Sequence, residues 1–100
     1  MVIWTNSAIK DLNTFIVNTK LGTDNSMKKY IKELLNYTDI LNILPNLGKK
    51  IYYKNKNIEI RQLVSKKHRI IYQIKNDKLY ILAIIHIKQN FKKIIYSLNF

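Results

Sequence analysis

The sequence predicts an α+β fold in which an N-terminal strand and a helical hairpin pack on an antiparallel β-meander. The expected order is β-α-α-β-β-β-β, closed by a short C-terminal helix or strand. Apolar residues recur at helical spacing as far as Asn42. Beyond Pro45 and Gly48, apolar and polar residues alternate as they do in strands. One hundred residues leave room for one core, so we expect a single domain over residues 1–100.

Residues 2–5 carry β-favouring side chains and are predicted to form a short first strand. Ser7, or alternatively Asn6, is a suitable N-cap for a helix over about residues 7–20. The apolar positions at helical spacing in this helix are Ala8, Leu12, Phe15 and Ile16.

A second helix is predicted to follow a short link and to run to about Asn42, which completes an αα-hairpin. Gly22 ends the first helix, and Asp24 or Asn25 caps the second. Its apolar stripe consists of Met27, Tyr30, Ile31, Leu34 and Leu35.

The meander is predicted to begin with a strand over residues 49–54 and a turn over residues 55–57. Residues 58–64 then alternate as a second strand. The helical hairpin is expected to cover one face of this sheet, which leaves Lys, Arg and His on the other face.

The meander is predicted to continue with a strand over residues 68–75, which ends at a hairpin turn over residues 76–77. Residues 79–86 form a nearly continuous apolar run and are expected to be the central strand, covered on both faces. Residues 89–97 supply the closing helix or strand.

Positive charge is concentrated in the second half of the chain. Residues 1–47 carry five Lys and four acidic residues, for a net charge of +1. Residues 48–100 carry 11 Lys, two Arg and two acidic residues, for a net charge of +11. A general compositional drift towards Lys does not explain so uneven a distribution. The charge therefore indicates a basic β surface for a polyanionic partner.

Absent and rare residue types exclude several kinds of chemistry. The chain has no Cys, which excludes disulfides, thiolate catalysis and Cys-ligated zinc and fits a reducing compartment. It has two His and few acidic residues near them, so we expect neither a metal site nor a cofactor.

The first residues do not resemble a signal peptide, and no apolar run is long enough to span a membrane. We therefore expect a cytoplasmic protein without membrane contact.

The two arginines, Arg61 and Arg69, are predicted to lie in adjacent strands. In a chain that favours Lys, a retained Arg indicates a need for its planar, bidentate guanidinium, either to bind phosphate or to stabilise charge in a transition state. The alternative for each is a structural role, such as a cross-strand ion pair with Glu59.

His86 ends the apolar run beside Lys88, where an imidazole can act as general acid or base on a phosphodiester. The alternative is a structural histidine. His68 precedes Arg69 at a position that suits aromatic packing. The catalytic candidates are therefore Arg69, His86 and Lys88.

Lysines and aromatic residues supply the candidates for binding. The lysine pairs are explained individually by a solvated surface, but together they attract nucleic acid with salt-sensitive affinity. The aromatic residues of the basic tail are suited to stack on a base or a partner. The residues assigned to nucleic-acid or target binding are Arg61, Lys49, Lys50, Phe91 and Tyr96.

Five short segments of the chain are weak motifs individually but are specific in combination. In chain order they are IWTNSAIKDL, LPNLGKK, IEIRQLV, HRIIYQI and DKLYILAIIH. Together they resemble the RelE/ParE superfamily of bacterial toxins from type II toxin–antitoxin systems, over about residues 2–96. His68 stands where the family usually has Tyr, and Lys88–Gln89 stands where it often has two basic residues.

The resemblance implies a compact growth-inhibiting toxin that a cognate antitoxin neutralises. In the RelE-like branch the toxin enters the ribosome and cleaves mRNA through attack by the ribose 2′-OH. Arg69 then matches a catalytic Arg, Lys88 a basic residue after the last strand, and Tyr96 a C-terminal Tyr. In the ParE-like branch the toxin poisons DNA gyrase, and the pattern of Arg61, Arg69 and His86 leans towards this branch.

Three hypotheses follow for the function. The first, which we favour from the sequence, is a ribosome-dependent, metal-independent mRNA endonuclease. The alternatives are a gyrase inhibitor without catalysis of its own and a non-toxic basic RNA-binding module. All three allow an antitoxin whose acidic or amphipathic segment folds on the apolar and basic surface. The clustered residues that form either a docking edge or part of the core are Ile94, Ile95, Leu98 and Phe100.

Overall fold

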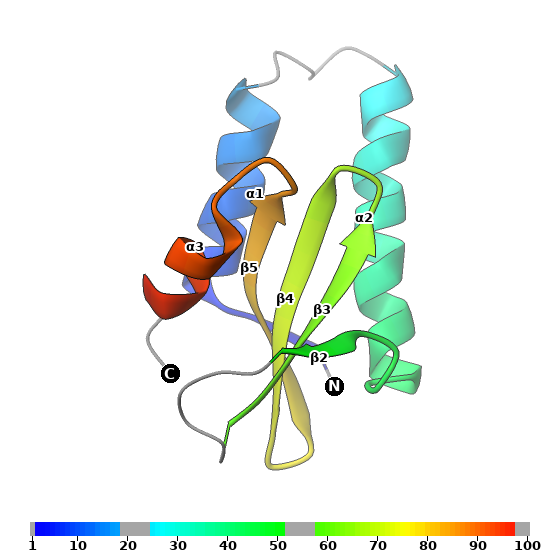
Figure 1. The fold of residues 1–100 in the computed structure, drawn as a ribbon. Helices are drawn as coiled ribbons and strands as arrows, with labels where there is room; N and C mark the ends of the chain where they lie inside the picture. Colours follow the sequence, from blue (N-terminus) through cyan, green and yellow to red (C-terminus); the bar gives the residue numbers. More distant parts are fainter. Residues whose placement is uncertain (1, 19–24, 52–57, 98–100) are drawn as a thin grey trace.

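The computed structural model describes residues 2–18, 25–51 and 58–97, and in these ranges it forms three helices and a five-stranded mixed sheet (Figure 1). The predicted α+β class and order of elements are confirmed, and the C-terminal element is a helix. The elements are β1 (Val2–Trp4), α1 (Asn6–Asn18), α2 (Asn25–Ile43), β2 (Lys49–Ile51), β3 (Glu59–Ser65), β4 (His68–Lys75), β5 (Lys78–His86) and α3 (Phe91–Ser97).

The strands lie in the order β1-β5-β4-β3-β2 across the sheet. Strands β2 to β5 form the predicted antiparallel meander, whereas β1 runs parallel to β5. Because β1 adds a strand beyond β5, the middle position belongs to β4. The apolar strand β5 is therefore interior, but it is not the central strand that the sequence predicted.

Helix α1 is capped by Thr5, and not by Ser7 or Asn6 as predicted. The Thr5 hydroxyl oxygen accepts a hydrogen bond from the Ala8 N–H at 3.2 Å, and the hydroxyl donates to the Ile81 carbonyl of β5 at 2.8 Å. The cap therefore also fixes the start of α1 to the sheet. This second contact is a tertiary one, so local capping preferences did not indicate it.

Helices α1 and α2 cover one face of the sheet (Figure 1). Apolar residues of both helices pack there against β4 and β5, as the helical periodicity predicted. The buried residues of this first core cluster are Ala8, Leu34, Leu41, Ile70, Tyr72, Leu79, Ile81 and Ile84.

Helix α3 lies on the opposite face, where a second core cluster forms (Figure 1). The expectation that this face carries only Lys, Arg and His is therefore wrong in part, because α3 buries an apolar strip. Strand β5 is covered on both faces, as predicted. Ile94 packs against this cluster and Ile95 belongs to it, so both close the core and do not form a docking edge. The buried residues of this cluster are Ile60, Ile71, Ala83, Ile85 and Ile95.

The connection between α2 and β2 is held against β4 by the buried Tyr72. The Tyr72 hydroxyl donates to the Pro45 carbonyl and accepts from the Gly48 N–H, both at 2.8 Å. A Cβ atom at position 48 would stand 2.5 Å from the Tyr72 hydroxyl oxygen and 2.7 Å from the Gln62 carbonyl oxygen. Position 48 therefore requires glycine because of this close approach.

The hairpin turn between β4 and β5 falls at Asn76 and Asp77, as predicted. Both residues have positive φ, 52° and 62°. This conformation is typical of the type I′ turn, which Asn and Asp tolerate.

Several predictions concern parts of the chain outside the described residues: the end of the first helix at Gly22, the cap of the second at Asp24, the last residues of the strand over 49–54, the turn over 55–57, and the placement of Leu98 and Phe100. Asn25, the alternative cap, is itself the first residue of α2. Within the described ranges, none of the helices combines the length and the apolar character needed to cross a bilayer.

Candidate functional site

Arg69 is the centre of a polar group on the α3 face of the sheet. Its guanidinium carbon stands 5.1 Å from the ring centroid of Phe91, the first residue of α3, and Nη1 donates to the Gln62 side-chain oxygen at 2.7 Å. The stacking contact and the hydrogen bond together fix the plane of the guanidinium. Its Nε is buried and has no hydrogen-bond partner among the residues that the structure describes.

His86 lies on the other face, towards α1. It is the cross-strand partner of His68, and the two rings meet edge to face with centroids 5.2 Å apart. His68 is buried, with 4% of its surface exposed. Its ring also meets the Phe15 ring edge-on, with the two centroids 4.4 Å apart. The aromatic-packing role expected for His68 is confirmed. The structure therefore does not bring Arg69 and His86 together.

The protonation of His68 follows from its contacts with α2. The Tyr30 hydroxyl is hydrogen-bonded both to the Ser65 carbonyl at 3.2 Å and to Nδ1 of His68. Because the carbonyl only accepts, Tyr30 donates to it and accepts from Nδ1–H. Burial, and then electrostatic interaction with His86 and Lys67, lower the pKa of His68 from 6.5 to about 4. His68 is consequently neutral at pH 7, with its proton on Nδ1.

A tight turn after β5 fixes the backbone and ring of His86. The Lys88 N–H donates to Nδ1 of His86 at 3.1 Å, so a neutral His86 carries its proton on Nε2. The Gln89 side-chain oxygen accepts from the His86 N–H at 2.7 Å. Lys88 itself is exposed in this turn.

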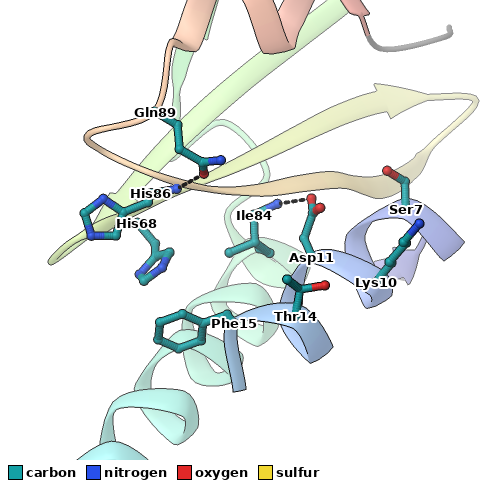
Figure 2. Close-up of a pocket in the computed structure, with 9 residues that line it drawn as sticks. All are labelled: Ser7, Lys10, Asp11, Thr14, Phe15, His68, Ile84, His86 and Gln89. Carbon is teal, nitrogen blue, oxygen red and sulfur yellow. Dashed lines mark hydrogen bonds between the residues drawn. The ribbon is translucent and has the colours of Figure 1, made fainter. Parts of the chain in front are cut away.

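A cavity of about 470 Å³ opens beside α1 and the end of β5, and His86 lies in its wall (Figure 2). Strand β5 extends here beyond its pairing with β1. In place of a β1 partner, the Asp11 carboxylate of α1 accepts a hydrogen bond from the Ile84 N–H at 3.1 Å. Burial raises the pKa of Asp11, although the Ile84 hydrogen bond and Lys10 lower it. The cavity holds polar side chains of both signs, but Arg69 does not line it.

Arg61 has a structural role. Its Nε donates to the Glu59 carboxylate at 2.9 Å, and its Nη1 donates to the Gly48 carbonyl at 2.8 Å. The ion pair that the sequence suggested is therefore present, although it lies within β3 and not across two strands. A role of Arg61 in binding a target stays a prediction.

The remaining binding candidates are exposed at two places. Lys49 and Lys50 lie in the edge strand β2, opposite Gln62 and Arg61 respectively, so Lys49 lies on the face of Arg69 and Lys50 on the face of α1 and α2. Tyr96 is 53% exposed on α3. In the described part of the chain, no cluster of His, Asp and Glu side chains is arranged to hold a metal ion.

Sequence reasoning missed Gln62, Tyr30 and Asp11 as members of these clusters. The alternation in β3 does place Gln62 on one face with Ile60 and Val64, so its side of the sheet was available from the sequence. The contacts of Tyr30 and Asp11 depend on how the helices dock on the sheet, and no local pattern indicates them.

The three helices and five-stranded mixed sheet of the described residues give the α+β architecture that the resemblance to RelE/ParE toxins implied. The chain belongs to the ParE toxin family, because a family model described as "ParE toxin of type II toxin-antitoxin system, parDE" matches residues 2–91. The resemblance stated from the sequence motifs is thereby confirmed, and membership implies a cognate antitoxin as partner. A search of curated proteins gave no match.

Proposed function

We propose that this toxin arrests growth by binding DNA gyrase in the cytoplasm and performs no catalytic step of its own. In this proposal residues 1–100 act as one toxin domain. The observation that carries the proposal is the separation of Arg69 from His86. A general acid or base must come within about 2.6–3.2 Å of the proton that it moves, while the charge-stabilising donor contacts the same reacting group. Side chains on opposite faces of one sheet do not meet at one phosphate.

The groups around Arg69 also favour binding over proton transfer. On the α3 face Arg69 contacts Gln62 and Phe91, and Lys49 lies beyond Gln62 in the neighbouring strand. None of these side-chain types ordinarily titrates near neutral pH, so none is a natural general base. They present a fixed guanidinium to a partner, and the ParE-like branch that the sequence resembles acts on gyrase.

Induction of the gene in a growing bacterium tests the proposal. We expect thymidine incorporation to fall first, together with DNA breaks and an SOS response, because a gyrase poison leaves cleaved DNA. Uninduced cells and cells that express a folded Arg69→Ala variant are the controls. Arrest of methionine incorporation without DNA damage would contradict the proposal.

The second candidate is the ribosome-dependent endonuclease, and the fixed guanidinium of Arg69 favours it. Charged, planar donors of this kind are suited to a phosphate whose negative charge increases during cleavage. In that case purified toxin cleaves mRNA only with ribosomes, and Arg69→Ala lowers the rate by about 10²–10³-fold. Intact mRNA in such a reaction would remove this candidate.

We further infer that the antitoxin covers an apolar stripe at the end of α2. A partner with an acidic, amphipathic segment suits this stripe because the toxin is strongly basic. Co-expression with the neighbouring open reading frame should rescue growth, and Ile43→Asp with Leu44→Asp should abolish the rescue while leaving toxicity. Rescue of this double variant would place the antitoxin elsewhere. The exposed apolar residues of the stripe are Ile40, Ile43, Leu44 and Leu47.

A further inference from the structure

We propose that the α3 face of the sheet binds the phosphate backbone of duplex DNA directly. This inference goes beyond the proposed function, because it gives the toxin a contact of its own with DNA and can be tested without gyrase. Three features carry it: the distribution of carboxylates between the two faces, the row of side chains around Arg69, and the exposed lysines of two joined turns and of the start of α3.

The α3 face carries no carboxylate within the described residues. Glu59 lies opposite Ile74, which packs on the first core cluster, so the Glu59 side chain belongs to the face of α1 and α2. Asp77 lies in the β4–β5 turn, at the end of the sheet away from the β3–β4 turn. The remaining described carboxylates are on the two covering helices: Asp11, Glu33 and Asp39. The described carboxylates are thus distributed unevenly between the two faces of the fold.

A row of side chains that contains the fixed Arg69 guanidinium crosses this face. Lys49 is the cross-strand partner of Gln62, and Gln62 holds the Arg69 guanidinium, which is stacked on Phe91. Because the guanidinium is already fixed, less side-chain entropy is lost when it binds a phosphate. Lys49 is exposed at the β2 end of the row.

The row leads to two turns that are joined at one end of the sheet. The Ile87 N–H donates to the Lys67 carbonyl at 2.8 Å, which ties the β5–α3 turn to the β3–β4 turn. In Figure 1 both turns lie at the same end of the sheet, and the β5–α3 turn leads into α3. Lys67, Lys88 and Lys92 are exposed there. Lys66 is different, because its amine is paired with Glu33 of α2 at 2.7 Å.

These features suit a double-stranded backbone better than unpaired bases. Proteins that hold single strands stack successive bases on exposed aromatic rings. Here the ring of Phe91 is instead occupied by the Arg69 guanidinium, and the exposed Tyr96 of α3 offers one ring, not a series of stacking positions. Exposed lysines without base-reading partners make the sequence-independent phosphate contacts of a duplex.

The test is fluorescence anisotropy of the purified toxin with a labelled duplex of about 20 base pairs, long enough to span one toxin face. The variant combines Lys67→Gln, Lys88→Gln and Lys92→Gln. The matched control combines Lys28→Gln, Lys29→Gln and Lys32→Gln, which removes the same charge from exposed positions of α2. Circular dichroism and thermal melting verify that all three proteins fold alike.

We expect the face variant to bind the duplex at least about tenfold more weakly near 0.1 M salt, and its slope of log affinity against log salt to be shallower by about 3. We expect the α2 control to stay within about threefold of the wild type. Equal losses in both variants would overturn the inference, because net charge alone would then explain binding. Tighter binding of a single-stranded RNA of equal length would overturn the commitment to duplex DNA.

The outcome is separable from that of the proposed function. Duplex binding that depends on Lys67, Lys88 and Lys92 supports this inference even if gyrase is not inhibited. Inhibition of gyrase by a toxin that does not bind the duplex overturns this inference and leaves the proposed function standing.

Discussion

The side chains of Arg69 and His86 lie on opposite faces of the sheet, although the two residues occupy the same end of the β4–β5 pair. His86 pairs with His68, and Arg69 pairs with Ile85. Because successive residues of a strand point to opposite faces, the histidine pair faces α1 whereas Arg69 faces α3. The interpretation of this toxin as a binding inhibitor depends on that separation.

His86→Ala is predicted to leave toxicity nearly unchanged, within about threefold, because His86 is not placed to transfer a proton near Arg69. Arg69→Ala is predicted to weaken toxicity by at least about tenfold, as loss of a binding hot spot does. The measurement is the expression level that halves the growth rate, normalised to soluble toxin. A loss of about 10²–10⁴-fold for His86→Ala would instead identify a general acid or base.

The free energy of unfolding is predicted to fall as the pH falls from about 6.5 towards 4, and His68 causes part of this. Its folded-state pKa is lowered to about 4, so in this window the unfolded chain binds a proton that the folded chain does not. The contribution of His68 to the free energy of unfolding is fully present above pH 6.5. About 2 kcal/mol of it is lost between pH 7 and pH 5.

His68→Phe should reduce this pH dependence while keeping the ring contact with Phe15. Urea unfolding of both proteins at pH 7 and pH 5 measures it. If the variant loses as much stability as the wild type on acidification, His68 is not the titrating group.

Asp11→Asn is predicted to leave the stability at pH 7 unchanged or to raise it. The Asn side-chain oxygen can still accept from the Ile84 N–H, and the substitution removes a carboxylate whose pKa burial raises. Asp11→Ala leaves the Ile84 N–H without this partner and should cost about 1–3 kcal/mol. Melting temperatures of the three proteins decide this, and equal losses in both variants would show that the hydrogen bond is unimportant.

Gly48→Ala is predicted to destabilise the fold by about 1–3 kcal/mol, because the added methyl group overlaps the Tyr72 hydroxyl. Tyr72→Phe should cost a similar amount, since it removes the acceptor of the Gly48 N–H. The double variant should lose less than the two single losses combined, because removing the hydroxyl relieves part of the overlap. Additive losses in urea unfolding would show that the two positions are not coupled.

Much of the fold could be predicted from the sequence because its signals are local. The helical stripe of α2, the alternation of β3 and the Asn76–Asp77 turn each depend on a few neighbouring residues. The hydrogen bond from the Thr5 hydroxyl to Ile81 could not be predicted, because Ile81 belongs to a distant strand. The parallel placement of β1 and the central position of β4 likewise arise only when the chain folds back on itself.

The candidate site was harder to predict for a related reason. Strand β5 is apolar on both faces, so its sequence does not show which face His86 occupies. The face of His86 is set by the register that pairs it with His68 and by the bulge between Ile71 and Tyr72. Family motifs identified Arg69 as important, but only the three-dimensional arrangement separates it from His86.

The most direct measurement of the central claim adds purified toxin to DNA gyrase with plasmid and ATP, and in parallel to translating ribosomes with a defined mRNA. We predict that supercoiling is inhibited, that cleaved DNA accumulates and that the mRNA stays intact, with Arg69→Ala weaker in the gyrase reaction. Cleavage of the mRNA on the ribosome, with gyrase unaffected, would contradict the claim that this toxin acts by binding gyrase.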